Sequence, residues 1–200
     1  MAEIASSERW LLVSVSTAGG TPSLRMHVWR RLRGLGAVYL QQSVCLLPDR
    51  KQIKREIARL LDRVRREGGS GRMLHLELTD PAERDELVAE FQEARDAEYE
   101  DLLERLPSFF DELETETARG RATYVEVEES EADLARFRTW LAKIEARDYF
   151  GAAAGDRARA ELARAADALA MFEDAALSAD TSSQTSRNTE ARRLHAVEGE

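Results

Sequence analysis

Apolar positions near the start of the chain alternate first with period two and then with the helical period. Residues 10–16 (WLLVSVS) end before the breaker pair Gly19-Gly20, which predicts a strand. We expect Thr21 to cap a helix with Pro22 at its first position, because both residue types are favoured there. The buried stripe of this helix recurs at spacings of four, four and three: Leu24, Val28, Leu32 and Leu35.

The same succession of periods recurs further along. Two short apolar runs at 37–41 and 43–47 predict a hairpin around Gln42. A second helix is expected to open at Asp49 and to stop at Gly68-Gly69. Its buried stripe consists of Ile53, Ile57, Leu60, Leu61 and Val64.

A fourth alternating run completes this part of the chain. Within residues 73–78, Leu74, Leu76 and Leu78 are expected on a buried face, opposite His75. The element order becomes β-α-β-β-α-β, the ferredoxin-like arrangement with both helices on one side of the sheet. We therefore predict an α+β protein with a ferredoxin-like domain at residues 8–79.

Helical spacing dominates the rest of the chain. Asp80-Pro81 is a strong helix start, and the stripe that follows continues to Pro107. Further amphipathic stripes at 134–144 and 156–177 predict a helical domain at residues 80–177.

Two segments differ from this helical pattern. Residues 123–128 (TYVEVE) alternate like a strand but have no evident partner strand, and their structure is left open. From Ser178 the sequence turns polar and rich in Ser and Thr, which predicts a disordered tail at residues 178–200.

Basic and acidic residues are distributed unevenly. Residues 1–72 contain 14 Lys and Arg against 6 Asp and Glu, a net charge of +8, whereas residues 73–200 contain 15 against 32, a net charge of −17. An anionic partner is attracted to the first part and repelled by the second. Contact with nucleic acid is therefore expected in the N-terminal part.

The composition favours a globular protein of a reducing compartment. No apolar run approaches the ~20 residues of a membrane span, and no basic leader precedes the first apolar run. The single cysteine, Cys45, cannot form an internal disulfide, and His27, His75 and His195 lack metal-ligand spacing. We expect a cytoplasmic protein that uses neither a membrane, a metal nor a cofactor.

Four segments resemble the N-terminal region of ChrB-type chromate-resistance regulators. They are residues 10–16 (WLLVSVS), 22–49 (PSLRMHVWRRLRGLGAVYLQQSVCLLPD), 80–106 (DPAERDELVAEFQEARDAEYEDLLERL) and 136–152 (RFRTWLAKIEARDYFGA). Residues 29–48 also resemble PaaX-type repressors and the small nucleases of CRISPR spacer acquisition. The chain departs from the family at Ser43 and Cys45, where a glycine and a tryptophan are common.

The resemblance implies a transcription regulator of a chromate-efflux operon, with DNA as partner and chromate as a candidate effector. Full-length members carry a C-terminal domain that this chain is expected to lack. The open edges of a small sheet and the long helix after residue 80 each offer a surface for a homodimer.

The candidate DNA-binding residues lie on the two helices of the first domain. Guanidinium groups pair bidentately with phosphate and keep their charge at any working pH. Like charges four residues apart destabilise a helix by ~0.2–0.5 kcal/mol per pair, so an arginine ladder calls for a partner. The candidates are Arg25, Arg30, Arg31 and Arg33 on the first helix and Lys51, Lys54, Arg55 and Arg59 on the second, where Arg63 and Arg66 continue the ladder.

Other readings of these residues stay open. Without the resemblance, the first helix is better explained as a solvated surface whose arginine stems cover its borders, and Glu56, Asp62 and Glu67 could neutralise the second helix. The chain would then be a protein-interaction module without DNA affinity. A third reading is a chromate-binding resistance protein, in which Arg30 and Arg31 hold the oxyanion.

An enzyme is disfavoured by the residues that replace the usual ligands. The similar nucleases hold a metal with a carboxylate at the end of the first strand, where this chain has Ser14, Ser16 and Thr17. Cys45 is expected in the core, as a packing group and not a redox sensor. The same packing role is expected of Trp29, Trp140, Tyr149 and Phe150.

Overall fold

The computed structural model describes residues 9–119 and 123–197, which fold into two compact units. The sheet unit comprises the residues up to Arg95 together with Glu145–Ala152, and the helical unit comprises Asp96–Ile144 and the residues from Ala153 onward. The start of the long helix after residue 80 and a later loop therefore both belong to the sheet unit.

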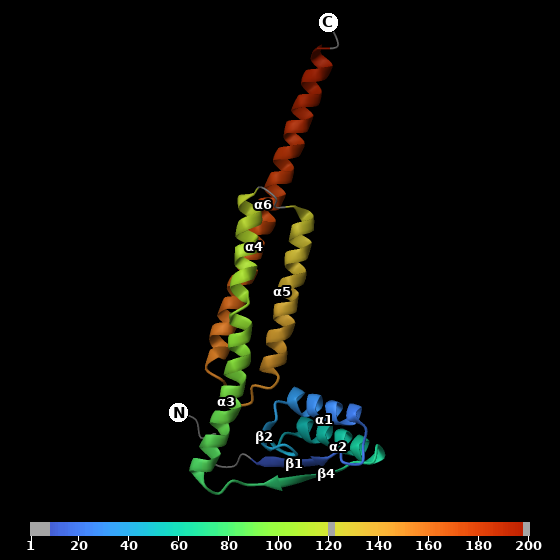
Figure 1. The fold of residues 1–200 in the computed structure, drawn as a ribbon. Coiled ribbons are helices and arrows are strands. Elements are labelled where there is room, and N and C mark those ends of the chain that lie inside the picture. Colours follow the sequence, from blue (N-terminus) through green and yellow to red (C-terminus); the bar gives the residue numbers. More distant parts are fainter. Residues whose placement is uncertain (1–8, 120–122, 198–200) are drawn as a thin grey trace. The chain divides into compact units, whose positions relative to one another are not determined.

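The sheet unit has the predicted order of strands and helices. All strand pairs are antiparallel and the strand order is β2-β3-β1-β4. Helices α1 and α2 cover the same face of the sheet (Figure 1). The elements are β1 (Trp10–Ser16), α1 (Pro22–Gly34), β2 (Val38–Gln41), β3 (Val44–Pro48), α2 (Lys51–Arg66) and β4 (Ser70–Leu76).

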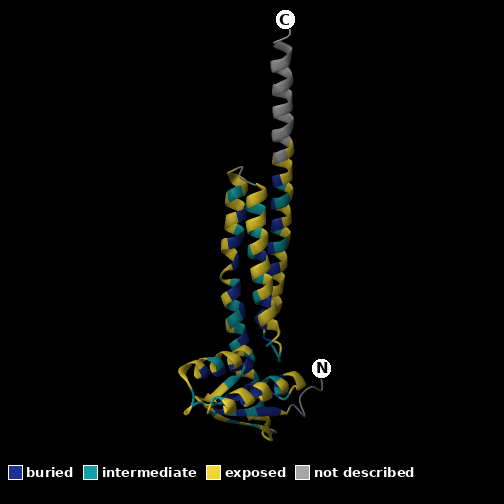
Figure 2. Ribbon diagram, turned by 90° about the vertical axis from the view of Figure 1, so that its right-hand side faces the viewer, coloured by how far each residue is buried: buried dark blue, intermediate teal, exposed yellow. Residues whose placement is uncertain are grey.

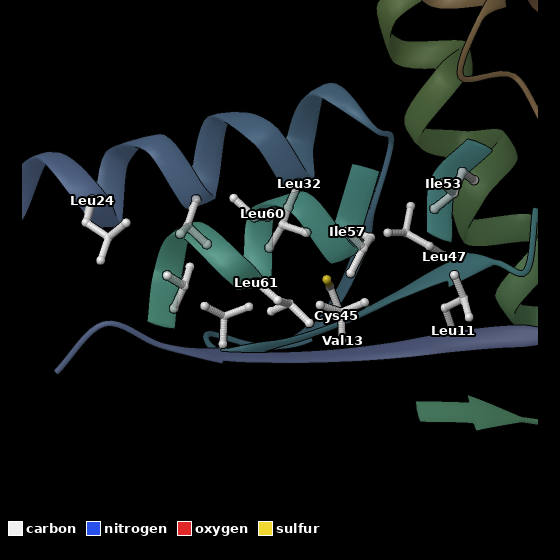
Figure 3. Packing of buried hydrophobic residues seen from close by; sticks show 13 residues of the cluster. Leu11, Val13, Leu24, Leu32, Cys45, Leu47, Ile53, Ile57, Leu60 and Leu61 are labelled. Carbon is white, nitrogen blue, oxygen red and sulfur yellow. The ribbon is translucent and has the colours of Figure 1, made fainter. Parts of the chain in front are cut away.

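The main core lies between the two helices and the sheet. The Thr21 side chain accepts a hydrogen bond from the backbone N–H of Leu24 at 3.2 Å, which confirms the predicted cap of α1. Figure 3 shows the stripes of both helices pointing at the same sheet face, with Cys45 among them. The buried stripes are Leu24, Val28 and Leu32 of α1 and Ile53, Ile57, Leu60, Leu61 and Val64 of α2.

The opposite face of the sheet has a smaller, aromatic core. Trp10 is fully buried there, with ring centroids 5.7 Å from Phe91 and 5.5 Å from Phe150. The Tyr149 hydroxyl donates to the Leu35 carbonyl at 2.8 Å, which ties the 145–152 loop to the end of α1. The packing role predicted for Tyr149 and Phe150 is therefore confirmed.

Two predictions about this unit were wrong. The residue that caps α2 is Arg50, without a side-chain cap, and not Asp49, whose carboxylate instead binds two side chains described below. Leu74 is 53% exposed, because the aromatic core covers only the part of this sheet face near Trp10 and Leu76, and Leu74 lies beyond it.

The helical unit is built from amphipathic helices. Buried and exposed positions alternate along each of them (Figure 2). The predicted helix of residues 81–106 ends earlier, at Leu103, and a new helix begins at Leu106 with Pro107 in its first turn. The elements are α3 (Pro81–Leu103, which starts in the sheet unit), α4 (Leu106–Ala118), α5 (Tyr124–Glu145) and α6 (Ala154–Val197).

Helix extends through two further segments. Residues 124–128, whose structure the sequence left open, form the first turns of α5. Helix α6 continues through residues 178–197, where the composition predicted disorder. Neither Gly nor Pro occurs between Asp156 and Glu198 to end the helix. Within the described residues, no helix is both long and apolar enough to cross a membrane.

Candidate nucleic-acid interface

Helices α1 and α2 lie next to each other on one face of the sheet. They carry most of the positive charge of the sheet unit. They contain eleven Lys and Arg residues against two carboxylates, Glu56 and Asp62. Because the apolar stripes of both helices turn toward the sheet, the basic side chains are left on the outer surface. We call the outer surface of α1 and α2 the basic face.

Glu56 neutralises part of the basic face. Its carboxylate accepts from Arg31 of the neighbouring helix and from the Nη1 of Arg59, at 3.1 Å. The hydrogen bond from Arg31 lowers the pKa of Glu56. Two of the eight candidate residues, Arg31 and Arg59, are therefore paired within the protein. This agrees with the hypothesis that local carboxylates neutralise the arginines.

Lys54 is engaged in the same way at the start of α2. Its Nζ lies 2.6 Å from Asp49 Oδ1, and His75 Nδ1 of β4 lies 2.8 Å from the other carboxylate oxygen. The Asp49 side chain is 5% exposed. The hydrogen bond from Lys54, followed by that from His75, holds the pKa of Asp49 below its usual value. Asp49 thus links α2 to β4.

Protonation of Asp49 is expected to destabilise the sheet unit. A carboxyl whose pKa is lowered by folding stabilises the fold fully above its unfolded pKa of ~3.9, and this contribution is lost as the pH falls through the folded pKa. We expect Asp49→Asn to flatten the fall in unfolding free energy below pH ~5, measured by urea denaturation. Asp62→Asn, which removes an exposed carboxylate of α2, should leave the fall unchanged; an equal flattening would contradict this role.

Five candidate residues keep their charge available on the basic face. Arg30 Nε donates only to the Met26 carbonyl, at 3.4 Å, and the Arg33 guanidinium lies 5.2 Å from the centre of the Trp29 ring. Neither contact neutralises the charge. Within the part of the chain that the structure describes, no ion pair is formed by Arg25, Arg30, Arg33, Lys51 or Arg55.

The arginine ladder of α2 continues beyond the candidates. Arg63 pairs with Glu67 at 2.7 Å and also contacts His27 of α1, at 3.2 Å. Burial and then the charge of Arg63 lower the pKa of His27, which favours its neutral form. Arg65 pairs with Asp62. The far end of α2 is therefore more neutralised than α1.

A cleft of about 690 Å³ borders α1. It lies between that helix, the end of β1 and the β2–β3 turn, and most of its lining is apolar. Trp29 lines it with 43% of its surface exposed, so the core packing predicted for Trp29 was wrong. The sequence does contain the signal: Trp29 falls one position after the buried Val28, about 100° away from the stripe.

The residues relevant to a metal or thiol site are placed elsewhere. The described residues contain no group of three His, Cys, Asp or Glu that could hold a metal ion. Cys45 is 1% exposed, as predicted, and burial raises the pKa of its thiol to about 12, so it stays protonated at neutral pH.

The helical unit has a separate apolar groove of about 1010 Å³ along α4 and α6. Phe110, Leu113 and Phe172 are among its apolar residues. Met171 on its border is 74% exposed.

Comparison with known proteins gives one match. The family model described as "Protein ChrB, N-terminal" matches residues 25–183, most of the chain. No curated protein and no solved structure matches. The matched range contains most of α1, all of α2 and most of the helical unit.

Proposed function

The chain belongs to the ChrB N-terminal family, and we propose that it acts as a DNA-binding transcription regulator of the chromate-resistance type. It binds DNA through the basic face, with chromate as an effector, and catalyses no reaction. We place it in the cytoplasm. The family supports the chromate-resistance context, whereas the charges of the sheet unit support the DNA partner.

The observation that carries this proposal is the group of unneutralised cations on α1 and α2. Arg25, Arg30 and Arg33 of α1 have no carboxylate partner among the described residues, and Lys51 and Arg55 extend the group onto α2. Five cations on one surface suit the closely spaced phosphates of DNA. Most phosphate contacts in DNA-binding proteins come from such side chains.

The fold of the sheet unit supports the same proposal. Antiparallel strands in the order β2-β3-β1-β4, with both helices on one face, agree with a ferredoxin-like domain. Strands β2 and β4 form the edges of this sheet, which supports a homodimer paired through an edge. Gel filtration with light scattering that finds only monomer would exclude the dimer.

Binding to duplex DNA should depend steeply on salt. Each neutralised phosphate contributes about −0.9 to the slope of log affinity against log salt, so about four contacts give a slope near −4. Fluorescence anisotropy of a labelled duplex across a chloride series measures this slope. Absence of binding even at low salt, or affinity independent of salt, would contradict DNA binding through the basic face.

A protein-interaction module is the second candidate, favoured by the groove on α4 and α6. Asp111, Glu114 and Glu161 border this apolar groove, which suits an amphipathic helix with basic flanks. The affinity of such a module for its partner would depend little on Arg30 and Arg33. The third candidate, oxyanion binding at Arg30 and Arg31, is weakened because Arg31 is already paired with Glu56.

A further inference from the structure

The cleft beside α1 differs from the rest of the basic face, because it combines exposed aromatic side chains with cations. Trp29 is 43% exposed and Tyr39 is 38% exposed, and both line the cleft. Arg25, which has no ion pair among the described residues, lines it as well. Large aromatic side chains left in contact with water at a cleft often mark a binding site.

The polar groups of the cleft lie at the ends of strands. The hydroxyl groups belong to Ser16, which ends β1, and to Thr17, which follows it, while Gln42 and Ser43 form the turn between β2 and β3. Such groups donate and accept hydrogen bonds, which orient a ligand within an otherwise apolar cleft. The volume of about 690 Å³ falls in the ~300–1,000 Å³ range of small-ligand clefts.

These features narrow the chemistry of the ligand. A small inorganic oxyanion would use Arg25 but would leave the faces of Trp29 and Tyr39 exposed. A purely apolar ligand would leave the charge of Arg25 without a partner. A planar aromatic group joined to a phosphate uses both, since bases stack on aromatic side chains and phosphates pair with guanidinium groups.

We propose that this cleft binds a nucleotide, with its base against Trp29 and Tyr39 and its phosphate at Arg25. The inference rests on the proposed DNA-binding function and deepens it. In a duplex, both faces of each base are already stacked, so the cleft takes an unpaired or extruded base. Single-stranded DNA and free nucleotides share this chemistry, and the experiment below separates them.

The Arg33 guanidinium adds to the stacking site. It lies 5.2 Å from the centre of the Trp29 ring, a cation–π distance, and so supports the indole from its own helix. Because this contact already restricts the indole, the indole loses less conformational entropy when a base binds. Trp29 is therefore the residue whose removal should affect nucleotide binding most.

The test compares single-stranded and duplex DNA with the full chain and with Trp29→Ala. Stacking contributes ~1–3 kcal/mol per base, so Trp29→Ala should weaken binding of labelled oligothymidylate by about 5-fold or more, in anisotropy titrations. Binding of a labelled duplex, whose bases are already stacked, should weaken by a smaller factor than binding of the single strand. Trp29→Phe, which keeps an aromatic ring, should restore most of the single-strand affinity.

A control variant and a competition experiment accompany this test. Leu74→Ala, which removes an exposed apolar side chain outside the cleft, should leave both affinities unchanged. Thymidine monophosphate that competes with the oligomer at similar affinity identifies a free nucleotide as the ligand; competition only by strands identifies single-stranded DNA.

Two results would overturn the nucleotide proposal. One is a native chain that binds duplex DNA but neither single strands nor the mononucleotide, which leaves the proposed function standing. The other is single-strand binding that Trp29→Ala does not change while circular dichroism shows the variant folded. If neither duplex nor single-stranded DNA binds, the result contradicts both the proposed function and the nucleotide proposal.

Discussion

Trp10→Ala is expected to lower the free energy of unfolding of the sheet unit by about 3–5 kcal/mol, the usual loss when a large aromatic side chain leaves a core. Trp10 is fully buried and stacks with Phe150, while Phe91 contacts it from α3. Its loss opens a cavity that three separate segments line. Marginal stability makes a loss of this size a large fraction of the total.

Urea denaturation followed by circular dichroism measures this loss. Trp10→Phe serves if the alanine variant does not fold, because it keeps a ring and removes an indole N–H that has no acceptor in the described part of the chain. Its cost should stay below about 2 kcal/mol. Leu74→Ala, on the same sheet face but 53% exposed, is the matched control. Equal losses for Trp10→Ala and Leu74→Ala would contradict the second core.

Arg30→Ala combined with Arg33→Ala is expected to weaken duplex binding by roughly 100-fold. Hydrogen bonds to charged groups contribute ~1.5–3 kcal/mol each. Neither arginine is paired with a carboxylate in the described chain, so the full charge of each is available to a phosphate. Because neither side chain takes part in the core, the fold should be preserved. Anisotropy titrations at fixed low salt measure the change.

The matched control removes the same charge from the helical unit. Arg136→Ala combined with Arg138→Ala affects two exposed arginines of α5, far along the chain from the basic face. Duplex affinity should change by less than about 2-fold. A loss as large as that of the α1 variant would show that overall charge, and not the basic face, governs binding.

Periodicity was sufficient to predict most buried positions of the two helices in the sheet unit. The buried stripe of α2 was correct residue by residue, and that of α1 was correct at Leu24, Val28 and Leu32, since each stripe must face the sheet for the core to form. Leu35, also predicted in the α1 stripe, follows the helix and is only partly buried. Thr21 and Gly68 marked a helix start and a helix end correctly, and Gly68 has the positive φ of 85° that such a stop uses. These features depend on local sequence alone.

The errors arose where partners distant in the chain decide the structure. Aspartate is a residue type favoured at helix caps, but Asp49 binds Lys54 and His75 instead. Leu74 alternates like a core residue, yet it lies outside the aromatic core formed by the described residues and is exposed. The alternation of residues 123–128 left their structure open, and residues 124–128 prove to be the start of α5.

The candidate interface was predictable only in part. Sequence spacing identifies the arginines, but only the fold shows that Glu56 reaches Arg31 across the two helices and leaves Arg30 and Arg33 unneutralised. The cleft at Trp29 was missed for a related reason. Its walls come from α1, β1 and the β2–β3 turn, which meet only once the sheet has formed.

The most direct test of the basic face is the change in salt dependence when two of its cations are removed. We predict that the slope of log affinity against log salt for duplex DNA becomes shallower by about two in the Arg30→Ala and Arg33→Ala variant. The α5 control should keep the slope of the native chain. An identical slope in the native chain and in both variants would contradict phosphate binding by α1.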